Sequence, residues 1–279
     1  MRIARLLAVA SLAAAVLAIV PATAQADPVH YYVALGDSLA VGYQPGLGDT
    51  GQGYADQLYP TLKAKDPALV LVKLGCSGET TGTMINGGRC TDGRYPAGSQ
   101  LNEAVAFLAA HGADVKYLTV DIGANDVDGC TPGGSIDPVC LAQGVLTIES
   151  NLPTILSRLR AADANLPRSV GMTYYDPFLE YWLHGVQGQL VATASVGLLA
   201  TINTAEIGMY NQYGFAVADV QGAYKTASVL PFTTVAPYGS LPTNVATICR
   251  LTYMCSVQNI HPNPAGYGVI AQAFAAKIS

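Results

Sequence analysis

Charged side chains are scarce in this sequence. Only 12% of its 279 residues are charged, and acidic residues outnumber basic ones by 19 to 14. Nucleic-acid binding needs lysines and arginines gathered on one face, and no basic run is present, so we expect no nucleic-acid partner. An uncharged ester or a sugar suits this acidic chain better than a polyanionic substrate.

Motifs for metals are also missing. The sequence has no C-x-x-C pair, and its four histidines, His30, His111, His184 and His261, lie far apart. Zinc sites are usually built from closely spaced cysteines and histidines, so we expect no metal. We likewise expect no cofactor. The six cysteines indicate disulfides if the chain is exported.

Six cysteines allow fifteen pairings, and the sequence alone does not select one of them. Proximity along the chain favours Cys76–Cys90, Cys130–Cys140 and Cys249–Cys255. Closing such short loops stabilises a protein by about 2–3 kcal/mol each, if the effect comes from the entropy of the unfolded chain.

Long apolar runs are absent except at the N-terminus. There, Arg2 and Arg5 precede the apolar run Leu6–Val20, and Ala24-Gln25-Ala26 fits a cleavage site. This pattern predicts a secretory signal peptide over residues 1–26, because the run is short for a membrane span. We therefore expect a secreted, extracellular protein with no transmembrane segment in its mature chain.

The remaining sequence alternates apolar runs with stretches of helical spacing. Strands are predicted over Tyr31–Leu35, Leu69–Leu74, Tyr117–Ile122, Ser169–Tyr174 and Phe215–Val220. Helices are predicted over Tyr54–Lys65, Leu101–Ala110, Leu141–Ala162, Leu190–Tyr213 and Pro264–Ile278. This alternation indicates an α/β fold with a parallel sheet covered on both faces. Because no linker interrupts it, we expect one domain over residues 27–279.

Several segments are candidates for the walls of a cleft. The glycine- and proline-rich stretches Cys76–Ser99, Gly129–Pro138 and Thr233–Met254 follow strands, where binding loops are common. Two further segments, Leu179–Val186 and Leu190–Leu199, are apolar enough to line a pocket for an acyl chain. A buried helix explains these two segments equally well, and we favour that interpretation.

The most informative motif is Gly36-Asp37-Ser38-Leu39, directly after the predicted strand Tyr31–Leu35. A serine on a turn at the carboxyl end of a strand can hold its hydroxyl away from the backbone, as a nucleophile must. By itself the motif is also typical of an ordinary turn or helix cap. Its interpretation therefore depends on the segments that accompany it.

Three other segments complete a constellation. Gly75–Thr81 and Asp121–Asp126 follow two further strands, and Ile260-His261-Pro262-Asn263 precedes the last helix. Parallel strands bring their carboxyl ends to one edge of the sheet, so these loops can share a rim.

Each side chain in the constellation suits one step of acyl transfer. Ser38 would attack a carbonyl carbon, and His261 would take its proton and return it to the leaving group. The main-chain N–H groups of Ser38 and Gly78 and the side-chain amide of Asn125 would stabilise the oxyanion.

This four-part pattern resembles the SGNH hydrolases, the GDSL lipase/esterase superfamily. The resemblance runs from Gly36 to Tyr267 and is most specific at Gly36–Leu39, Gly123–Asp126 and His261–Tyr267. It implies a flavodoxin-like three-layer α/β/α sandwich with a five-stranded parallel sheet and cofactor-free hydrolysis of esters. Within the superfamily, the chain is most similar to secreted actinobacterial members with three disulfides.

One block departs from the family pattern. The family usually places an aspartate three residues before the histidine, and Gln258 stands there in this chain. The resemblance implies a Ser–His dyad in which the main-chain carbonyl of Asn259, or the amide oxygen of Gln258, orients His261. Because a helix N-terminus disfavours a charged imidazole, we expect activity at neutral and alkaline pH that falls on acidification before pH 5 is reached.

The sequence thus predicts a secreted serine esterase or lipase that hydrolyses acyl esters through an acyl-enzyme intermediate. One alternative is an esterase that removes acetyl or acyl groups from polysaccharides. A second, from another class, is a catalytically silent domain that binds glycans of the cell envelope. The expected partner is a small-molecule, lipid or acylated-glycan ester, and the protein is expected to be a monomer.

Overall fold

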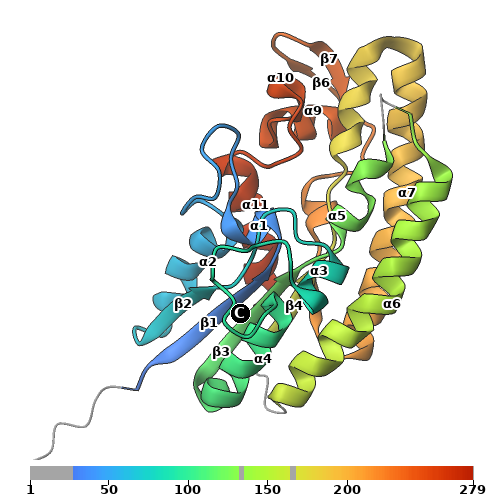
Figure 1. The fold of residues 1–279 in the computed structure, drawn as a ribbon. Helices are drawn as coiled ribbons and strands as arrows, with labels where there is room; N and C mark the ends of the chain where they lie inside the picture. Colours follow the sequence, from blue (N-terminus) through green and yellow to red (C-terminus); the bar gives the residue numbers. More distant parts are fainter. Residues whose placement is uncertain (1–27, 132–134, 164–167, 279) are drawn as a thin grey trace, which may run out of the picture.

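The computed structural model describes residues 28–131, 135–163 and 168–278 (Figure 1). The predicted signal peptide, residues 1–26, lies outside the described residues.

A five-stranded parallel sheet forms the centre of the structure, with strand order β2-β1-β3-β4-β5. Its strands are β1 (His30–Gly36), β2 (Leu69–Lys73), β3 (Val115–Asp121), β4 (Arg168–Met172) and β5 (Ala216–Ala218). The direction in which the chain adds strands reverses between β1 and β3. In open α/β sheets, ligands bind outside the carboxyl ends of the strands at such a reversal. The predicted fold class is confirmed.

Helices cover both faces of the sheet (Figure 1). One face packs against α2 (Tyr54–Lys63), α8 (Val220–Ala223) and α11 (Pro264–Ile278). The other packs against α3 (Thr81–Asn86), α4 (Gln100–His111), α6 (Pro138–Ala162) and α7 (Gly185–Gln212). The remaining elements are α1 (Ser38–Val41), η1 (Gly112–Asp114), α5 (Ala124–Val127), η2 (Asp128–Cys130), η4 (Pro177–His184), β6 (Phe232–Val235), β7 (Gly239–Pro242), α9 (Thr243–Leu251) and α10 (Met254–Val257).

Strand β1 shows why its sequence is apolar without interruption. Tyr32 and Ala34 are buried in the core beneath α2 and α11, whereas Val33 and Leu35 are buried in the core beneath α4 and α6. Successive side chains of a strand point to opposite faces, so a sheet covered on both sides needs apolar residues at every position.

Helices α6 and α7 begin earlier than the sequence predicts. The prediction placed the start of α6 at Leu141, but Asp137 caps the helix by accepting hydrogen bonds from the N–H groups of Val139 and Cys140, and Pro138 occupies its first position. Helix α7 begins at Gly185 instead of Leu190 and directly follows η4.

Two segments in the described part of the chain, Pro138–Ala162 and Pro177–Gln212, are long and apolar enough to cross a membrane by length and composition. Each also has residues packed in the core, as core helices of α/β proteins do. Leu152 and Ile155 of α6 and Ile202 and Tyr210 of α7 are buried against the sheet.

The structure contains three disulfides, Cys76–Cys90, Cys130–Cys140 and Cys249–Cys255. These are the pairs that proximity along the chain favours. The second joins η2 to the first turn of α6, and the third joins α9 to α10.

Candidate active site

The turn that carries Ser38 is shaped by the glycine before it. Gly36 has φ +134°, and a Cβ at this position would lie 2.1 Å from the main-chain oxygen of Asp121. Only glycine fits so close to the neighbouring strand in this conformation. Asp37 then caps α1, because its Oδ1 accepts a hydrogen bond from the Leu39 N–H at 2.9 Å. Ser38 is therefore fixed as the first residue of α1.

Asp37 also connects the Ser38 turn to the loop that carries Asn125. The Asn125 side-chain Nδ2 donates to Asp37 Oδ2 at 3.3 Å and to the main-chain oxygen of Glu79 at 2.9 Å. Ser38 Oγ donates to Asp37 Oδ1 at 3.4 Å, which is a long, weak hydrogen bond. The Asp37 carboxylate thus links the Ser38 turn to the Asn125 loop, and Asn125 in turn contacts the Gly75–Thr81 segment through the Glu79 oxygen.

A second buried acid lies behind this carboxylate. Asp121 is fully buried and accepts a hydrogen bond from the Tyr54 hydroxyl at 2.7 Å. Burial raises the pKa of Asp121 well above its ordinary value, and the nearby Asp37 charge raises it further. Burial also raises the pKa of Asp37, to about 6. Of the two acids, Asp121 therefore has the stronger tendency to hold a proton and Asp37 the stronger tendency to carry the charge.

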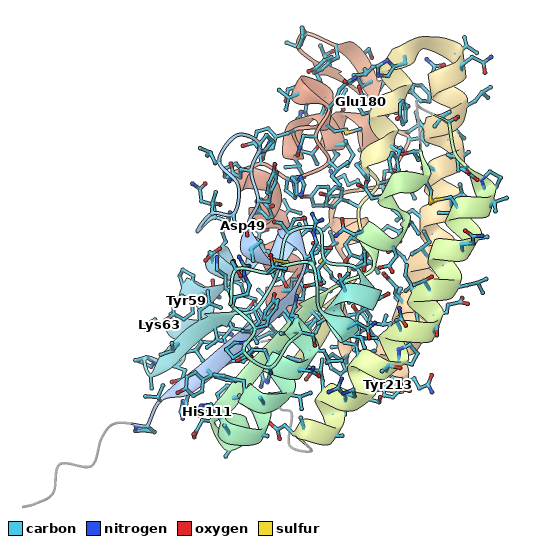
Figure 2. The ribbon with its side chains drawn as sticks, in the orientation of Figure 1. Asp49, Tyr59, Lys63, His111, Glu180 and Tyr213 are labelled. Atoms are coloured by element: carbon cyan, nitrogen blue, oxygen red, sulfur yellow. A yellow bond between two sulfur atoms is a disulfide. The ribbon has the colours of Figure 1, made fainter. Side chains whose placement is uncertain are left out.

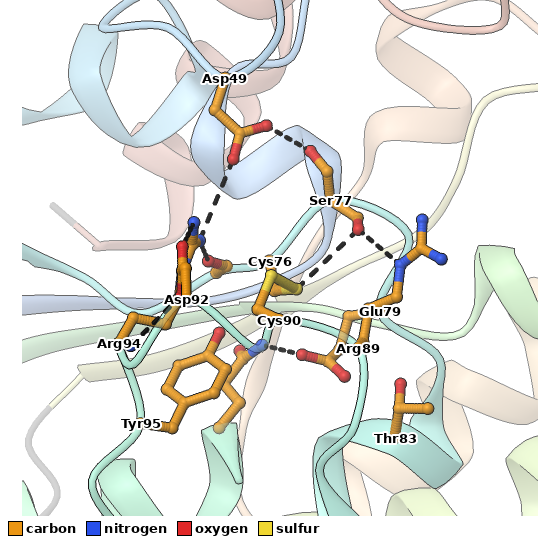
Figure 3. The surroundings of a disulfide bond; sticks show 12 residues. Asp49, Cys76, Ser77, Glu79, Thr83, Arg89, Cys90, Asp92, Arg94 and Tyr95 are labelled. Carbon is orange, nitrogen blue, oxygen red and sulfur yellow. Dashed lines mark hydrogen bonds and ion pairs between the residues drawn. A yellow bond between two sulfur atoms is a disulfide. The ribbon is translucent and has the colours of Figure 1, made fainter.

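Gly78 lies in a loop held by a disulfide and several polar contacts (Figure 3). Arg89 Nε donates to the main-chain oxygen of Ser77 at 2.9 Å, and Ser77 Oγ donates to Asp49 Oδ1 at 2.5 Å. A Cβ at Gly78 would lie 2.1 Å from a nitrogen of the Arg89 guanidinium, which covers this glycine. Gly78 therefore cannot take a side chain without displacing Arg89.

His261 is oriented by the side chain of Asn259. The imidazole Nδ1 lies 2.8 Å from Asn259 Oδ1, and the His261 main-chain N–H donates to the same oxygen at 3.2 Å. Because an amide oxygen only accepts, Nδ1 carries the proton and Nε2 is left as the base. Of the two residues named from the sequence, Asn259 is the contact and Gln258 is not. The group involved is the Asn259 side chain instead of its main-chain carbonyl.

The surroundings of His261 keep it neutral. Its ring centroid lies 4.4 Å from that of Tyr43, and burial lowers the pKa of His261 to about 4, although Asp49 opposes the shift. The imidazole is thus ready to accept a proton throughout the neutral range. A pKa of about 4 means that His261 gains its proton only near that pH, and the fall of activity on acidification stays a prediction.

Replacing Asn259 with aspartate is expected to raise the pH at which activity falls on acidification. A carboxylate against Nδ1 favours the charged imidazole and raises the pKa of His261 by about 1–3 units. The acidic limb of kcat/KM, measured with a p-nitrophenyl ester, should shift upward by the same amount. Asp37 has a pKa of about 6 and is present in the wild type and in the variant alike. The difference between their acidic limbs of kcat/KM therefore reports on His261.

Gln258→Glu is the matched control, because it adds the same charge at a side chain that does not contact the imidazole. Its acidic limb should coincide with that of the wild type. Equal shifts in both variants, or no shift in Asn259→Asp, would show that Asn259 does not orient the base.

One cavity connects these residues, and we call it the first cavity. Its walls include Asp37, Ser38, Asn125 and His261. It does not include Gly78. Of the four residues that match the family pattern, the structure thus brings Ser38, Asn125 and His261 to one cavity. Within the described residues, the N–H groups of Ser38 and Gly78 donate no hydrogen bond, but only Ser38 lines the first cavity, whereas Gly78 lies beneath the Arg89 guanidinium.

Much of this cavity comes from residues that the sequence analysis missed. Tyr174, Tyr175, Pro177 and Phe178 follow β4 and form one wall, and Ile202 of α7 contributes to another. Leu199 of that second wall belongs to the segment Leu190–Leu199, which the sequence did mark as apolar enough to line a pocket. The signal for the first wall was available, because its four residues lie beyond the carboxyl end of a strand, like the motifs that were found.

The predicted cleft segments contribute less than expected. Among the described residues, no wall residue of the first cavity comes from Cys76–Ser99, Gly129–Pro138 or Thr233–Met254. The last of these forms the β6–β7 hairpin and helix α9. The described part of Gly129–Pro138 does line a neighbouring cavity, through Cys130, Thr131 and Ile136. The segment Leu190–Leu199, interpreted as a buried helix, is only partly buried, since 60% of Leu190 is exposed.

The other three histidines lie elsewhere. His30 contacts Asp66, His184 contacts Glu180, and His111 packs against Tyr31 and Phe107. Figure 2 places His111 well away from the Asp49 loop beside the candidate site. Residues 28–131, 135–163 and 168–278 contain no group of three histidine, cysteine or acidic side chains arranged to hold a metal ion.

A comparison with protein families matches residues 34–269 to the GDSL-like lipase/acylhydrolase family. The chain belongs to this family. Its predicted membership is thereby confirmed, and so is its class as a carboxylic ester hydrolase.

Solved structures share the fold of this GDSL-family hydrolase at low sequence identity. An extracellular lipase from Streptomyces rimosus is 17% identical, with a TM-score of 0.54 over 89% of this chain and 100% of that one. Phospholipase A1 from Streptomyces albidoflavus is 20% identical, with a TM-score of 0.52 over 89% and 99% of the two chains. An acetylxylan esterase from Geobacillus stearothermophilus is 16% identical, with a TM-score of 0.53 over 89% and 94%. No curated protein sequence matches the chain.

Proposed function

We propose that this hydrolase cleaves acyl esters with Ser38 as nucleophile and His261 as general base and acid. The observation that carries the proposal is that both residues line one cavity at the strand-order reversal, with a neutral His261 held by Asn259. Neutral Nε2 removes the Ser38 hydroxyl proton as Oγ attacks the ester carbonyl. The resulting imidazolium then protonates the alcohol that leaves, and water repeats the sequence on the acyl-enzyme.

Candidate donors for the oxyanion lie close to the nucleophile. The free N–H of Ser38 lies on the same turn as its Oγ, and a donor fixed before the reaction lowers the barrier because no reorganisation is needed as charge develops. Asn125 Nδ2 lies on the same cavity wall, but its two N–H groups already donate to Asp37 and to the main-chain oxygen of Glu79, so the amide would have to leave one of these partners to bind the oxyanion. The N–H of Gly78 is the third candidate, and Arg89, which covers this glycine, would have to move for it to reach the oxyanion.

Asn259 takes the place of the usual acidic residue in this scheme. Its amide oxygen selects the same imidazole tautomer as a carboxylate would, but adds no negative charge to stabilise the imidazolium. We therefore treat Asn259 as a positioning residue and Ser38 and His261 as the catalytic dyad.

The walls of the first cavity favour an acyl ester over an acylated polysaccharide. Exposed tyrosines over an open groove would suit a sugar, but Tyr174 and Tyr175 are each only 5% exposed. Pro177, Phe178 and Leu199 give the cavity an apolar wall that suits an alkyl group. The three disulfides support secretion, because such bonds persist in oxidising compartments.

Hydrolysis of p-nitrophenyl acetate and butyrate by the mature, oxidised protein tests this function. We expect turnover of both esters, and no release of acetate from an acetylated xylan above the rate without enzyme. Turnover of the xylan alone would identify a polysaccharide esterase. A folded protein that hydrolyses neither substrate and binds envelope glycans would identify the silent binding domain.

A further inference from the structure

The first cavity has two neighbouring cavities beneath α7. The second cavity shares five wall residues with the first: Val127, Pro177, Phe178, Leu199 and Ile202. The third cavity lies between α6 and α7 and shares Ile136, Leu141, Leu198 and Ile202 with the second. The three cavities therefore lie side by side, separated by the side chains that they share, in a row from Ser38 toward the outer surface of the two helices, and we call this row the path.

The residues along this path leave little for a polar ligand to bind. In the second cavity, Ser195 Oγ donates to Asp176 Oδ2 at 2.7 Å, so these two polar groups satisfy each other. In the third, Thr201 Oγ donates to the main-chain oxygen of Gly197 at 3.1 Å. Their other walls are mostly aliphatic, and an apolar void of this kind excludes sugars, which would lose hydrogen bonds to water.

Exposed leucines mark the outer end of the path. Leu146 of α6 is 64% exposed and Leu198 of α7 is 36% exposed, and both line the third cavity. An alkyl chain lying there would cover apolar surface that water otherwise contacts.

We propose that the acyl part of the substrate is a long alkyl chain that runs from Ser38 through the second cavity and emerges between α6 and α7. This inference rests on the proposed function and adds the substrate class. Leu198 is the specificity-determining residue, because it borders the second and third cavities but not the first.

Chain-length dependence tests the proposal. We expect kcat/KM for p-nitrophenyl esters to rise from acetyl to dodecanoyl, by up to about fourfold for each methylene that becomes buried. Leu198→Trp would block the path beyond the second cavity. It should leave acetyl and butyryl esters within twofold of wild type and remove the rise for longer chains.

Leu190→Trp is the matched control. It makes the same substitution eight residues earlier on α7, at a leucine that lines none of the three cavities. Its profile should follow that of the wild type. Two results would overturn the proposal. One is a wild-type kcat/KM that stays flat or falls for acyl chains longer than butyryl, and the other is a Leu198→Trp variant that loses the same activity at every chain length. Either result would leave ester hydrolysis established.

A binding measurement separates this inference from the proposed mechanism. Ser38→Ala should bind laurate in isothermal titration, and Ser38→Ala with Leu198→Trp should bind it at least tenfold more weakly. Absence of laurate binding by the first variant would overturn the alkyl path even if short esters are hydrolysed. Laurate binding by a protein that hydrolyses no ester would overturn the proposed function and keep the path.

Discussion

Replacing Ser38 with alanine is expected to lower kcat/KM for p-nitrophenyl butyrate by about 10⁶-fold, the scale seen when a serine hydrolase loses its nucleophile. No acyl-enzyme can form without Oγ, and the remaining groups only bind the ester and polarise its carbonyl. The fold should be unaffected, because Ser38 Oγ makes only a long hydrogen bond to Asp37, at 3.4 Å. Thermal unfolding of the variant should therefore match that of the wild type.

Ser157→Ala is the control for this variant. Ser157 lies on α6, where its hydroxyl donates to the main-chain oxygen of Thr154 at 3.1 Å, and it lines none of the three cavities. Its activity should equal that of the wild type. If Ser38→Ala retained more than about one hundredth of the activity, another group would be the nucleophile.

Replacing His261 with alanine is expected to cause a loss of similar size, about 10⁶-fold. Without the imidazole, Asn259 offers only an amide, and the Asp37 carboxylate meets the Ser38 hydroxyl only in a long, weak hydrogen bond of 3.4 Å, so it is a poor substitute for the base. The double variant with Ser38→Ala should lose no further activity, since the two residues act in one step. Added imidazole should restore part of the activity of His261→Ala and none of that of Ser38→Ala.

His111→Ala is the histidine control, because His111 packs against Tyr31 and Phe107 away from the cavity. It should retain wild-type kcat/KM and gain nothing from imidazole. Losses that add up in the double variant, or no rescue of His261→Ala, would assign His261 a structural role.

The fold could be predicted because its strands are buried on both faces. Each central strand reads as a continuous apolar run, and each run is followed by a helix, so the alternation itself indicates a parallel sheet. Element ends were less predictable. The start of α6 depends on the cap formed by Asp137, and the hairpin β6–β7 pairs only four residues of each strand.

The candidate residues could be predicted because they follow strands whose carboxyl ends meet. What the sequence could not provide was the contact between side chains. Asn259 reaches the imidazole with its amide oxygen, which depends on the turn that places Gln258 at φ +52°. Glu206 on α7 is fully buried with both carboxyl oxygens unpartnered, and burial raises its pKa well above the ordinary value. A charged residue in a helical sequence normally predicts a solvent-facing position.

The walls of the cavities were the least predictable feature. Leu198 and Leu199 are adjacent on α7, yet Leu199 lines the first and second cavities while Leu198 lines the second and third. Such differences depend on how a long helix is rotated against its neighbours, and hydropathy alone does not fix that rotation.

Covalent labelling by a p-nitrophenyl alkylphosphonate tests the central claim most directly. The phosphonate is attacked by an activated serine and releases p-nitrophenol, leaving a stable adduct whose mass can be measured. We predict one adduct per chain, located by peptide mass spectrometry at Ser38, and none in Ser38→Ala. No adduct on the folded wild-type protein, or an adduct at another residue, would contradict the assignment of Ser38 as the nucleophile.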